Sequence, residues 1–327
     1  MSVSRPTVSE PCPVCGGSGS HAYTGRDLLM HLPGEFSYAE CGDCGAVYQA
    51  PMPDAQRIAS FYPDDYQPYR PGREKRRSAL ERAVLRSRYG YAHLDSGFPR
   101  WLAGILGAFV HRHAVPFTGS GRLLDVGCGG GKYLRSMRAL GWEPEGVEFN
   151  RGAVETCRAA GLKVFQGELS EAGFPDGHFD VVTARHVIEH IPAPVDFVTE
   201  IHRILKPGGL MVLMTPNSRA LGRGWFGVHW FANDIPRHLV LFSPENLARL
   251  AGRAGFEPAV VRTSSTPKIV LNSWDYKFGV RGRPSKKRKL RRILARPYVA
   301  ASTLLGRGDE IFAIFRKPLD AGDAPPS

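Results

Sequence analysis

No apolar run in this 327-residue sequence is long enough to cross a membrane as a helix. The longest, WLAGILGAFV, ends at Val110 and falls well short of the roughly 20 residues required. The first fifteen residues lack the apolar stretch of a secretory signal, so the sequence predicts a cytoplasmic protein. Acidic side chains are few: 31 Asp and Glu stand against 43 Lys and Arg, which leaves a net charge of +12.

The excess positive charge is concentrated in two runs, Arg73–Arg88 and Arg281–Arg292. Runs of this kind favour a polyanionic partner, either nucleic acid or an anionic membrane surface. A solvated helix face or a loop explains them equally well at this stage. An apolar stretch follows the second run, which favours an anionic partner more than the first run does.

Cysteine is also scarce, and its six positions do not form a disulfide pattern. Four of the cysteines form two CxxC pairs, Cys12 with Cys15 and Cys41 with Cys44, whereas Cys128 and Cys157 stand apart. Each CxxC turn directs two thiolates at one point, and a glycine after the second cysteine permits the required backbone shape. The spacing predicts a zinc ribbon over residues 1–55 with a closed, structural zinc site. Two unrelated pairs or a redox motif are the alternatives.

A second region begins at Gly121, where a short apolar strand (Leu123–Val126) leads into a glycine-dense turn and then a helix. Gly127, Gly129 and Gly131 let the backbone approach a ligand closely, because a side chain at any of them would fill that space. Asp125 lies near the end of the strand.

The pattern of strand and helix then repeats. A strand ending at Glu148, 21 residues beyond Gly127, places an acid where it can accept hydrogen bonds from both hydroxyls of a ribose. The further predicted elements are strands Leu162–Gln166, Phe179–Ala184 and Leu210–Thr215, and helix Val195–Leu205. This alternation predicts an α/β fold with a doubly wound parallel sheet. Ligands of such sheets bind beyond the carboxyl ends of the strands, where Asp125, Glu148, Glu168 and His186 lie.

Four segments, LLDVGCGGGKYL, GVEFN, FPDGHFDVVTARHVIEHI and LKPGGLMVLMTPN, resemble class I S-adenosylmethionine-dependent methyltransferases in content and order. The competing nicotinamide dehydrogenases carry GxGxxG, whereas this turn reads GCGGG. The resemblance implies a Rossmann-like, seven-stranded sheet and S-adenosylmethionine as the cofactor. The residues that it implies for cofactor binding are Asp125, Gly127, Cys128, Gly129, Gly131, Glu148, Phe149, Glu168, Leu169 and Arg185.

The segment HVIEH (His186–His190) also matches HxxEH, a zinc-peptidase pattern. A peptidase needs this pattern inside a helix, but here it directly follows a predicted buried strand. In quinone-biosynthesis and small-RNA ribose methyltransferases, a similar ExxEH and a later histidine contribute to a divalent-cation site. This sequence has His186 in place of the first glutamate, which weakens the case for Mg²⁺, and His238 as a candidate partner.

Glu189, His190 and His238 are therefore the candidate catalytic residues, and a divalent cation near them is one interpretation. A methyl acceptor with a hydroxyl group must lose a proton, and His190 or His238 could act as the general base. His186 is a weaker candidate. The alternative is that Glu189 and His190 only cap or pack near the cofactor.

The C-terminal part carries WFGVHWF, PRHL, FSPENL and GRGDEI, which resemble a methyltransferase subgroup of cell-surface polysaccharide biosynthesis. The resemblance implies a sugar or lipid-linked glycan as the acceptor. We expect a helical linker over 56–118, a methyltransferase domain over 119–318 with a basic insertion at 264–309, and a disordered tail at 319–327. Residues 281–306 would form an amphipathic arm, either peripheral on the inner membrane surface or packed into the core.

Two other functions compete with glycan methylation. The acceptor could be RNA held by the ribbon and the basic arm, although the basic runs lack the interleaved aromatics that stack on bases. No DPPY-like or NPPY-like segment follows the fourth strand, which argues against methylation of exocyclic amines of DNA bases. A non-catalytic binding module is the third candidate, and the intact Asp125, Gly127, Gly129 and Glu148 argue against it.

Overall fold

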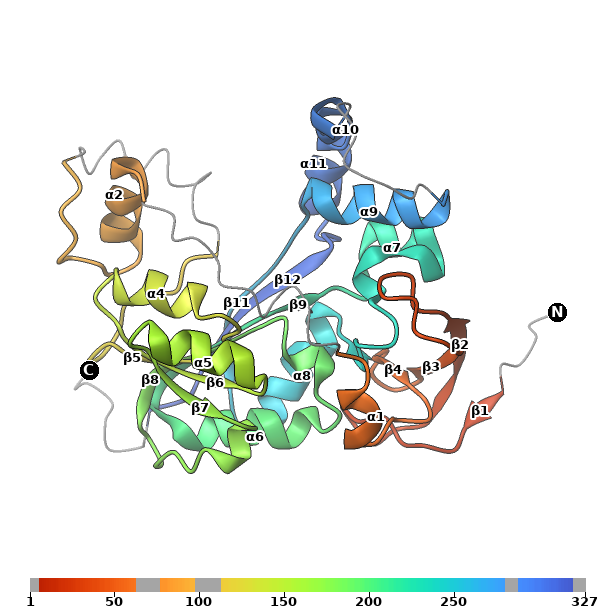
Figure 1. Cartoon of the computed structure of the whole chain (residues 1–327), viewed down its shortest axis with the longest axis horizontal. Coiled ribbons are helices and arrows are strands. Elements are labelled where there is room, and N and C mark those ends of the chain that lie inside the picture. The colour runs from red at the N-terminus through yellow and green to blue at the C-terminus, as the bar shows by residue number, and fades with distance from the viewer. Residues whose placement is uncertain (1–5, 63–76, 98–112, 280–287, 320–327) are drawn as a thin grey trace. The chain divides into compact units, whose positions relative to one another are not determined.

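The computed structural model describes residues 6–62, 77–97, 113–279 and 288–319 (Figure 1). The chain separates into two compact units, each assembled from several stretches of sequence. The first unit contains Met1–Asp64, Arg185–Thr199 and Leu213–Phe315, and the second contains Asp65–Ala184, Glu200–Val212 and Arg316–Ser327. The domain boundaries expected from the sequence stay predictions. Most of the predicted tail and parts of both basic runs lie outside the described residues.

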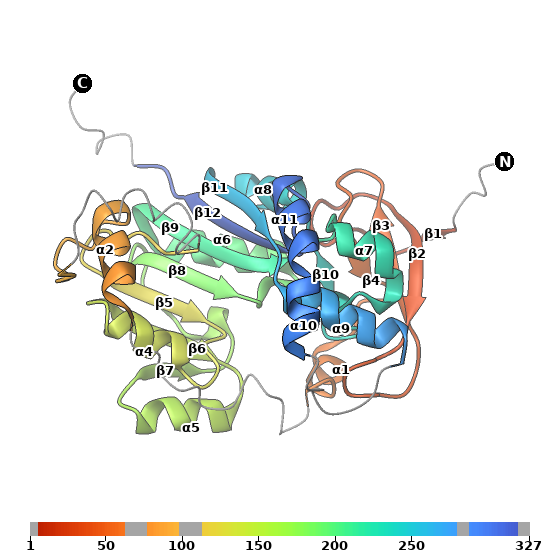
Figure 2. The ribbon, with the colours of Figure 1, turned by 90° about the horizontal axis from the view of Figure 1, so that it is seen from above.

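The second unit contains the repeating strands and helices. Strands β5 (Arg122–Val126), β6 (Glu143–Glu148), β7 (Lys163–Gln166) and β8 (Phe179–Arg185) pair in parallel, with β5 between β6 and β8 (Figure 2). Helix α4 (Lys132–Arg138) follows β5, and α5 (Arg151–Ala159) follows β6. Because β5 pairs with β6 on one side and β8 on the other, the strand order reverses beside β5. Ligands of α/β sheets bind at this kind of position.

The complete sheet has seven strands in the order β11-β12-β9-β8-β5-β6-β7. The three remaining strands are β9 (Leu205–Pro216), β11 (Glu257–Ser264) and β12 (Glu310–Arg316), and helix α6 (Pro194–Ile204) precedes β9. The Rossmann-like α/β fold predicted from the sequence is therefore confirmed.

One predicted boundary in this sheet is wrong, because β9 begins at Leu205 and not at Leu210. The segment between Leu205 and Leu210, KPGG, already forms backbone hydrogen bonds: Gly208 N donates to Lys317 O, and Lys317 N donates to Gly209 O. Pairing with a distant segment therefore outweighs the local turn preference of proline and glycine.

The first unit contains a separate five-stranded sheet in the order β1-β2-β3-β4-β10. Its N-terminal strands are β1 (Thr7–Val8), β2 (Gly19–Gly25), β3 (Phe36–Cys41) and β4 (Val47–Gln49). The fifth, β10 (Val240–Leu241), comes from the C-terminal half and runs antiparallel to β4, with Val240 opposite Tyr48. The N-terminal sheet is thus completed by a strand nearly 200 residues away, which the sequence analysis did not predict.

The helices of the first unit are α1 (Ala55–Ala59), α7 (Leu221–Phe226), α8 (Pro244–Arg253), α9 (Pro267–Lys277), α10 (Arg288–Leu294) and α11 (Arg296–Leu304). Short 3-10 turns are η3 (Ile188–His190), η4 (Gly227–His229) and η5 (Phe231–Asn233). The second unit adds α2 (Ala79–Arg88) and η2 (Leu169–Glu171). Ser243 caps α8, with Pro244 at its first helical position. Across the ranges that the structure describes, no helix has both the length and the apolar character needed to cross a membrane.

Candidate functional site

The turn after β5 depends on glycine at three positions. Gly127, Gly129 and Gly131 have φ values of 67°, 52° and 71°, a region that residues with a side chain rarely adopt. At Gly131 a β-carbon would also lie 2.7 Å from Cys157 Sγ and 2.7 Å from Leu162 Cδ1. Backbone conformation therefore requires glycine at these positions, and at Gly131 packing requires it as well.

Glu148 supports the turn from the end of β6. Its Oε2 accepts a hydrogen bond from Gly129 N at 2.7 Å, and its Oε1 accepts one from Asn150 N at 2.8 Å. Burial raises the pKa of Glu148, and these backbone hydrogen bonds offset part of that effect. Each carboxylate oxygen retains a lone pair that could accept a ribose hydroxyl.

Other predicted cofactor residues of the second unit lie at or just after the ends of β5, β6 and β7. Asp125 is buried and accepts a hydrogen bond from Thr183 Oγ1 at 2.6 Å. Phe149, next to Glu148, is 64% exposed and offers a flat apolar ring to a ligand. Leu169 is buried and Glu168 is exposed where η2 begins. The arrangement fits S-adenosylmethionine, which carries a ribose and an aromatic base.

Arg185 and Cys128 are two further residues predicted to bind the cofactor. Arg185 belongs to the first unit, where its Nη2 lies 4.0 Å from Met214 Sδ. Cys128 Sγ donates to Gly129 O at 3.8 Å, and Cys157 Sγ donates to the same oxygen at 3.2 Å. Both thiols are buried beneath the turn. Cys157 therefore supports the turn, although the sequence analysis had assigned it no part there.

A second cluster, formed by Glu189, His190 and His238, lies in the first unit. A carboxylate oxygen of Glu189 and one ring nitrogen from each of the two histidines all lie within 4.8 Å of one another. Glu189 is fully buried, and its Oε2 has no hydrogen-bond partner among the described residues. A buried carboxylate oxygen without a partner is costly, so this atom is suited to a ligand.

The hydrogen bonds of the two histidines determine which ring nitrogen carries the proton. His190 Nδ1 lies 2.9 Å from Arg237 O and 2.7 Å from the Tyr62 hydroxyl, and His238 Nδ1 lies 2.9 Å from Ala232 O. A backbone carbonyl only accepts, so each Nδ1 must be the donor. Each Nε2 consequently keeps a lone pair, and that of His238 is 4.0 Å from Glu189 Oε1.

The charges around these residues favour an ionised glutamate and a neutral imidazole. Burial alone would raise the pKa of Glu189, but the hydrogen bond and positive charge of His186 lower it to about 2. Burial, and then the repulsion that would arise if His190 and His238 were both protonated, lowers the pKa of His190 to about 4. An ionised carboxylate and a neutral imidazole are what a metal ion or a proton acceptor requires.

His186 has a different role from the other residues of the HVIEH segment. It adopts a φ of 56° and lies between two carboxylates, with Nδ1 3.3 Å from Glu189 Oε1 and Nε2 3.2 Å from Glu310 Oε1. Burial would lower its pKa, but these two carboxylates outweigh it and raise the pKa to about 10. Both ring nitrogens are engaged and η3 is a 3-10 turn, so the segment does not form a peptidase helix.

The donor set of the cluster indicates which cations would fit. Glu189, His190 and His238 offer one carboxylate and two imidazole nitrogens, which suits a divalent transition metal better than Mg²⁺. The hydrogen bonds from each Nδ1 to a carbonyl are the outer-shell contacts that usually orient metal-bound histidines.

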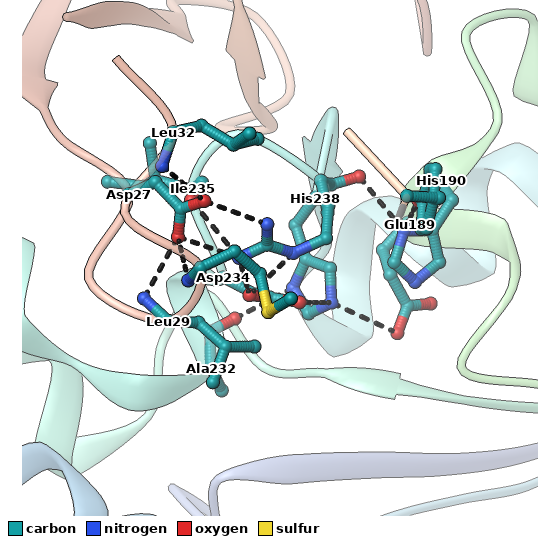
Figure 3. A network of polar contacts seen from close by, with 12 residues as sticks. Asp27, Leu29, Leu32, Glu189, His190, Ala232, Asp234, Ile235 and His238 are labelled. Carbon is teal, nitrogen blue, oxygen red and sulfur yellow. Dashed lines mark hydrogen bonds and ion pairs between the residues drawn. The ribbon is translucent and has the colours of Figure 1, made fainter. Parts of the chain in front are cut away.

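A buried polar network connects this cluster to the N-terminal sheet (Figure 3). Arg237 donates to both carboxylate oxygens of Asp27, at 2.9 and 3.0 Å, and to Asp234 at 2.7 Å. Asp234 Oδ2 lies 3.8 Å from His238 Nε2, and the Tyr38 hydroxyl donates to His238 O. Asp27, Asp234 and Arg237 were not predicted as site residues, because no local pattern links Asp27 to Arg237, 210 positions away.

The four N-terminal cysteines converge as their spacing predicts. Cys12 Sγ lies 3.7 Å from Cys44 Sγ, and Cys15 Sγ lies 3.4 Å from Cys41 Sγ. The glycines after each pair, Gly16 and Gly45, have positive φ. Backbone amides donate to Cys12 and Cys15. Since a Zn–S bond is about 2.3 Å, sulfurs of a tetrahedral zinc site are separated by about 3.8 Å, and the cluster fits a structural zinc ion.

Comparison with known proteins identifies the family. Residues 98–261, half of the chain, match the profile of a family described as "Methyltransferase domain". The chain is 33% identical over 161 residues to a ubiquinone biosynthesis O-methyltransferase of Ralstonia nicotianae, covering 45% of this chain and 67% of that protein. It is 31% identical over 181 residues to an enzyme of the same name from Cereibacter sphaeroides, covering 51% and 71%.

A solved structure of an S-adenosylmethionine-dependent methyltransferase from Archaeoglobus fulgidus superposes with a TM-score of 0.45 at 18% identity, over 72% of this chain and 98% of that one. The family profile spans half of the chain, and the two relatives align over two thirds or more of their own length. The chain therefore belongs to this methyltransferase family and is an S-adenosylmethionine-dependent methyltransferase.

Proposed function

We propose that this enzyme methylates a hydroxyl group of a sugar or a lipid-linked glycan intermediate. The observation that carries the proposal is the cluster of Glu189, His190 and His238, with two unprotonated imidazole nitrogens beside a buried carboxylate. A hydroxyl acceptor must lose its proton as the carbon–oxygen bond forms, and these groups can accept it.

The second unit supplies the residues that bind and orient the cofactor. Glu148 would accept the ribose hydroxyls, the turn from Gly127 to Gly131 would lie against the ligand, and Phe149 would cover its base. The bound cofactor supplies a methyl group that its sulfonium has already activated for transfer. The protein has then to orient the acceptor oxygen and exclude water.

The proton of the acceptor would move to His238 Nε2, because His238 Nδ1 is already protonated toward Ala232 O. Glu189 would stabilise the imidazolium that forms. If a divalent cation binds this cluster, Glu189, His190 and His238 would hold it, and it would lower the pKa of a hydroxyl bound to it.

The acceptor is proposed to differ from that of the quinone enzymes. Asp27, Tyr38 and Tyr62, which contact the cluster or its network, all precede the segment that matches the methyltransferase family. The basic helix α10 and helix α11 follow that segment. A ring hydroxyl of a quinone precursor is the second candidate, and the names of the two curated relatives favour it.

The test is methyl transfer from labelled S-adenosylmethionine to three acceptor pools: glycolipids with nucleotide sugars, hydroxylated quinone precursors, and RNA. Label in the first pool supports the proposal. Label in the quinone pool establishes the second candidate, and label in RNA overturns both.

Variants of the cluster test the assigned site in the same assay. Glu189→Gln and His238→Asn should lower kcat by about 10²- to 10⁴-fold with cofactor affinity unchanged. His21→Asn, a histidine on β2 that hydrogen-bonds to Thr24, is the matched control. Full activity of the Glu189→Gln variant would show that the chemistry takes place elsewhere.

A further inference from the structure

Large apolar side chains are exposed together on four helices of the first unit. Trp225 of α7, Trp274 of α9, and Leu290, Ile293 and Leu294 of α10 are each more than half exposed. Leu304, at the end of α11, is 86% exposed. We call the exposed face of α7, α9, α10 and α11 the helical surface. Exposed apolar patches on soluble proteins usually mark a binding site.

Contacts between the helices make this one continuous surface (Figures 1 and 2). Lys277 Nζ of α9 donates to Trp225 O of α7, and Arg291 Nη2 of α10 pairs with Asp275 Oδ1 of α9 at 2.5 Å. The rings of Trp225 and Tyr298, from α7 and α11, have their centroids 5.7 Å apart. The exposed side chains are therefore held by neighbouring, connected helices.

The charge of the same region is strongly positive. Between Ser265 and Gly308 the sequence has twelve lysines and arginines but a single acidic residue, Asp275. Arg291 already neutralises Asp275. Arg292 and Arg296 are exposed on α10 and α11, next to the apolar side chains. The partner must therefore be anionic and must also accept apolar groups.

We propose that the helical surface docks on an anionic lipid bilayer, independently of which acceptor the enzyme uses. Tryptophan favours the headgroup level, aliphatic side chains enter the acyl boundary, and arginine and lysine pair with anionic headgroups. A second copy of the chain fits less well, because a two-fold interface would bring identical basic surfaces together. RNA would leave the aliphatic side chains without a partner.

The test uses the full-length protein and sedimentation with two kinds of vesicle, phosphatidylcholine alone and an equal mixture with phosphatidylglycerol. We expect binding to the mixed vesicles to be at least about tenfold tighter and to weaken with salt, because the charges act near the surface. Equal affinity for both kinds of vesicle, or no binding to either, would overturn the proposal.

Variants separate the apolar from the charged contribution. Leu290→Ser with Leu294→Ser, and Arg292→Glu with Arg296→Glu, should each reduce binding to the mixed vesicles by about tenfold or more. Leu29→Ser, a 40% exposed leucine after β2, should bind like the wild type. Cofactor affinity, measured in every variant, confirms folding.

The rival occupants give different results. Suppose that the wild type is a dimer in sedimentation velocity, that the Leu290→Ser, Leu294→Ser variant is a monomer, and that the protein does not bind vesicles. The helical surface would then be a self-association interface. If the protein binds RNA but not vesicles, and only the Arg292→Glu, Arg296→Glu variant loses RNA binding, the helical surface would be a nucleic-acid site. Either result would replace the bilayer proposal.

Discussion

Asp27 has a fully buried side chain that combines two roles. It accepts backbone hydrogen bonds from Leu29, Met30 and Leu32 in the loop after β2, and it forms an ion pair with the buried Arg237. Burial would raise the pKa of Asp27, but these interactions together lower it. Arg237 directly precedes His238, so this ion pair fixes the backbone that carries a candidate catalytic residue.

We predict that Asp27→Asn destabilises the protein by about 3 kcal/mol, because it leaves a buried arginine with only one of its two carboxylates. The measurement is urea unfolding followed by circular dichroism. Glu35→Gln is the control, since Glu35 forms an exposed ion pair with Arg26 on the same hairpin. That change should cost less than about 1 kcal/mol. Equal effects of the two substitutions would contradict the assigned importance of the buried pair.

At the scale of elements, Asp180 joins the beginnings of three strands. From the start of β8 it accepts hydrogen bonds from Arg122 N of β5 at 2.9 Å and from Lys206 Nζ of β9 at 2.7 Å. The hydroxyl of Ser120 donates to it as well. Burial would raise the pKa of Asp180, but these donors, Lys206 first, lower it.

Some carboxylates have a pKa in the folded state that lies below the unfolded-state value of about 3.9. Such a group contributes its full stabilisation when the pH is above about 3.9. The stabilisation is lost as the pH falls through the folded pKa. Asp180→Asn should therefore lower the free energy of unfolding by about 2 kcal/mol at pH 7, with a smaller difference from the wild type below about pH 4.

Urea unfolding of both proteins between pH 3 and pH 8 measures this difference. Asp176→Asn serves as the control, because Asp176 is exposed and its ion pair with Arg203 lies at the surface. Its effect should stay below about 1 kcal/mol at every pH. A difference between Asp180→Asn and wild type that does not change with pH would contradict the role of the ionised carboxylate.

At the scale of the whole molecule, the cysteine-rich segment is built into the first unit. Besides the β4–β10 pairing, Asn246 Nδ2 of α8 donates to Cys44 O, and Arg253 of the same helix donates to Val14 O. Tyr38 and Asp27 connect the same segment to His238 and Arg237. Loss of order around the four thiols should therefore spread to the candidate catalytic cluster.

We predict that the wild type binds one zinc ion per chain and that Cys12→Ser with Cys41→Ser releases it. Metal analysis gives the stoichiometry, and hydrogen exchange should show faster exchange in β10 and α8, with β5 and β6 unchanged. Cys157→Ser, which alters a buried cysteine outside the cluster, should keep the zinc. Absence of zinc from the wild type would remove the zinc-ribbon assignment.

The elements that sequence analysis predicted well have a local physical cause. The strand that ends at Val126 contains an apolar run, and the turn after it needs positive φ at three glycines. The spacing of the two CxxC pairs likewise predicts that their four sulfurs converge. The methyltransferase fold and the candidate cofactor residues follow from such signals.

Tertiary structure decided the features that depend on distant contacts. Pairing with Lys317 moved the start of β9, a two-residue strand joined the N-terminal sheet, and His186 lies between Glu189 and Glu310. The Asp27–Arg237 ion pair belongs with them. Backbone preferences and short spacings act within a few residues, so they can be predicted from the sequence alone. Which buried charges meet depends on how separate segments pack, and only the folded chain specifies that.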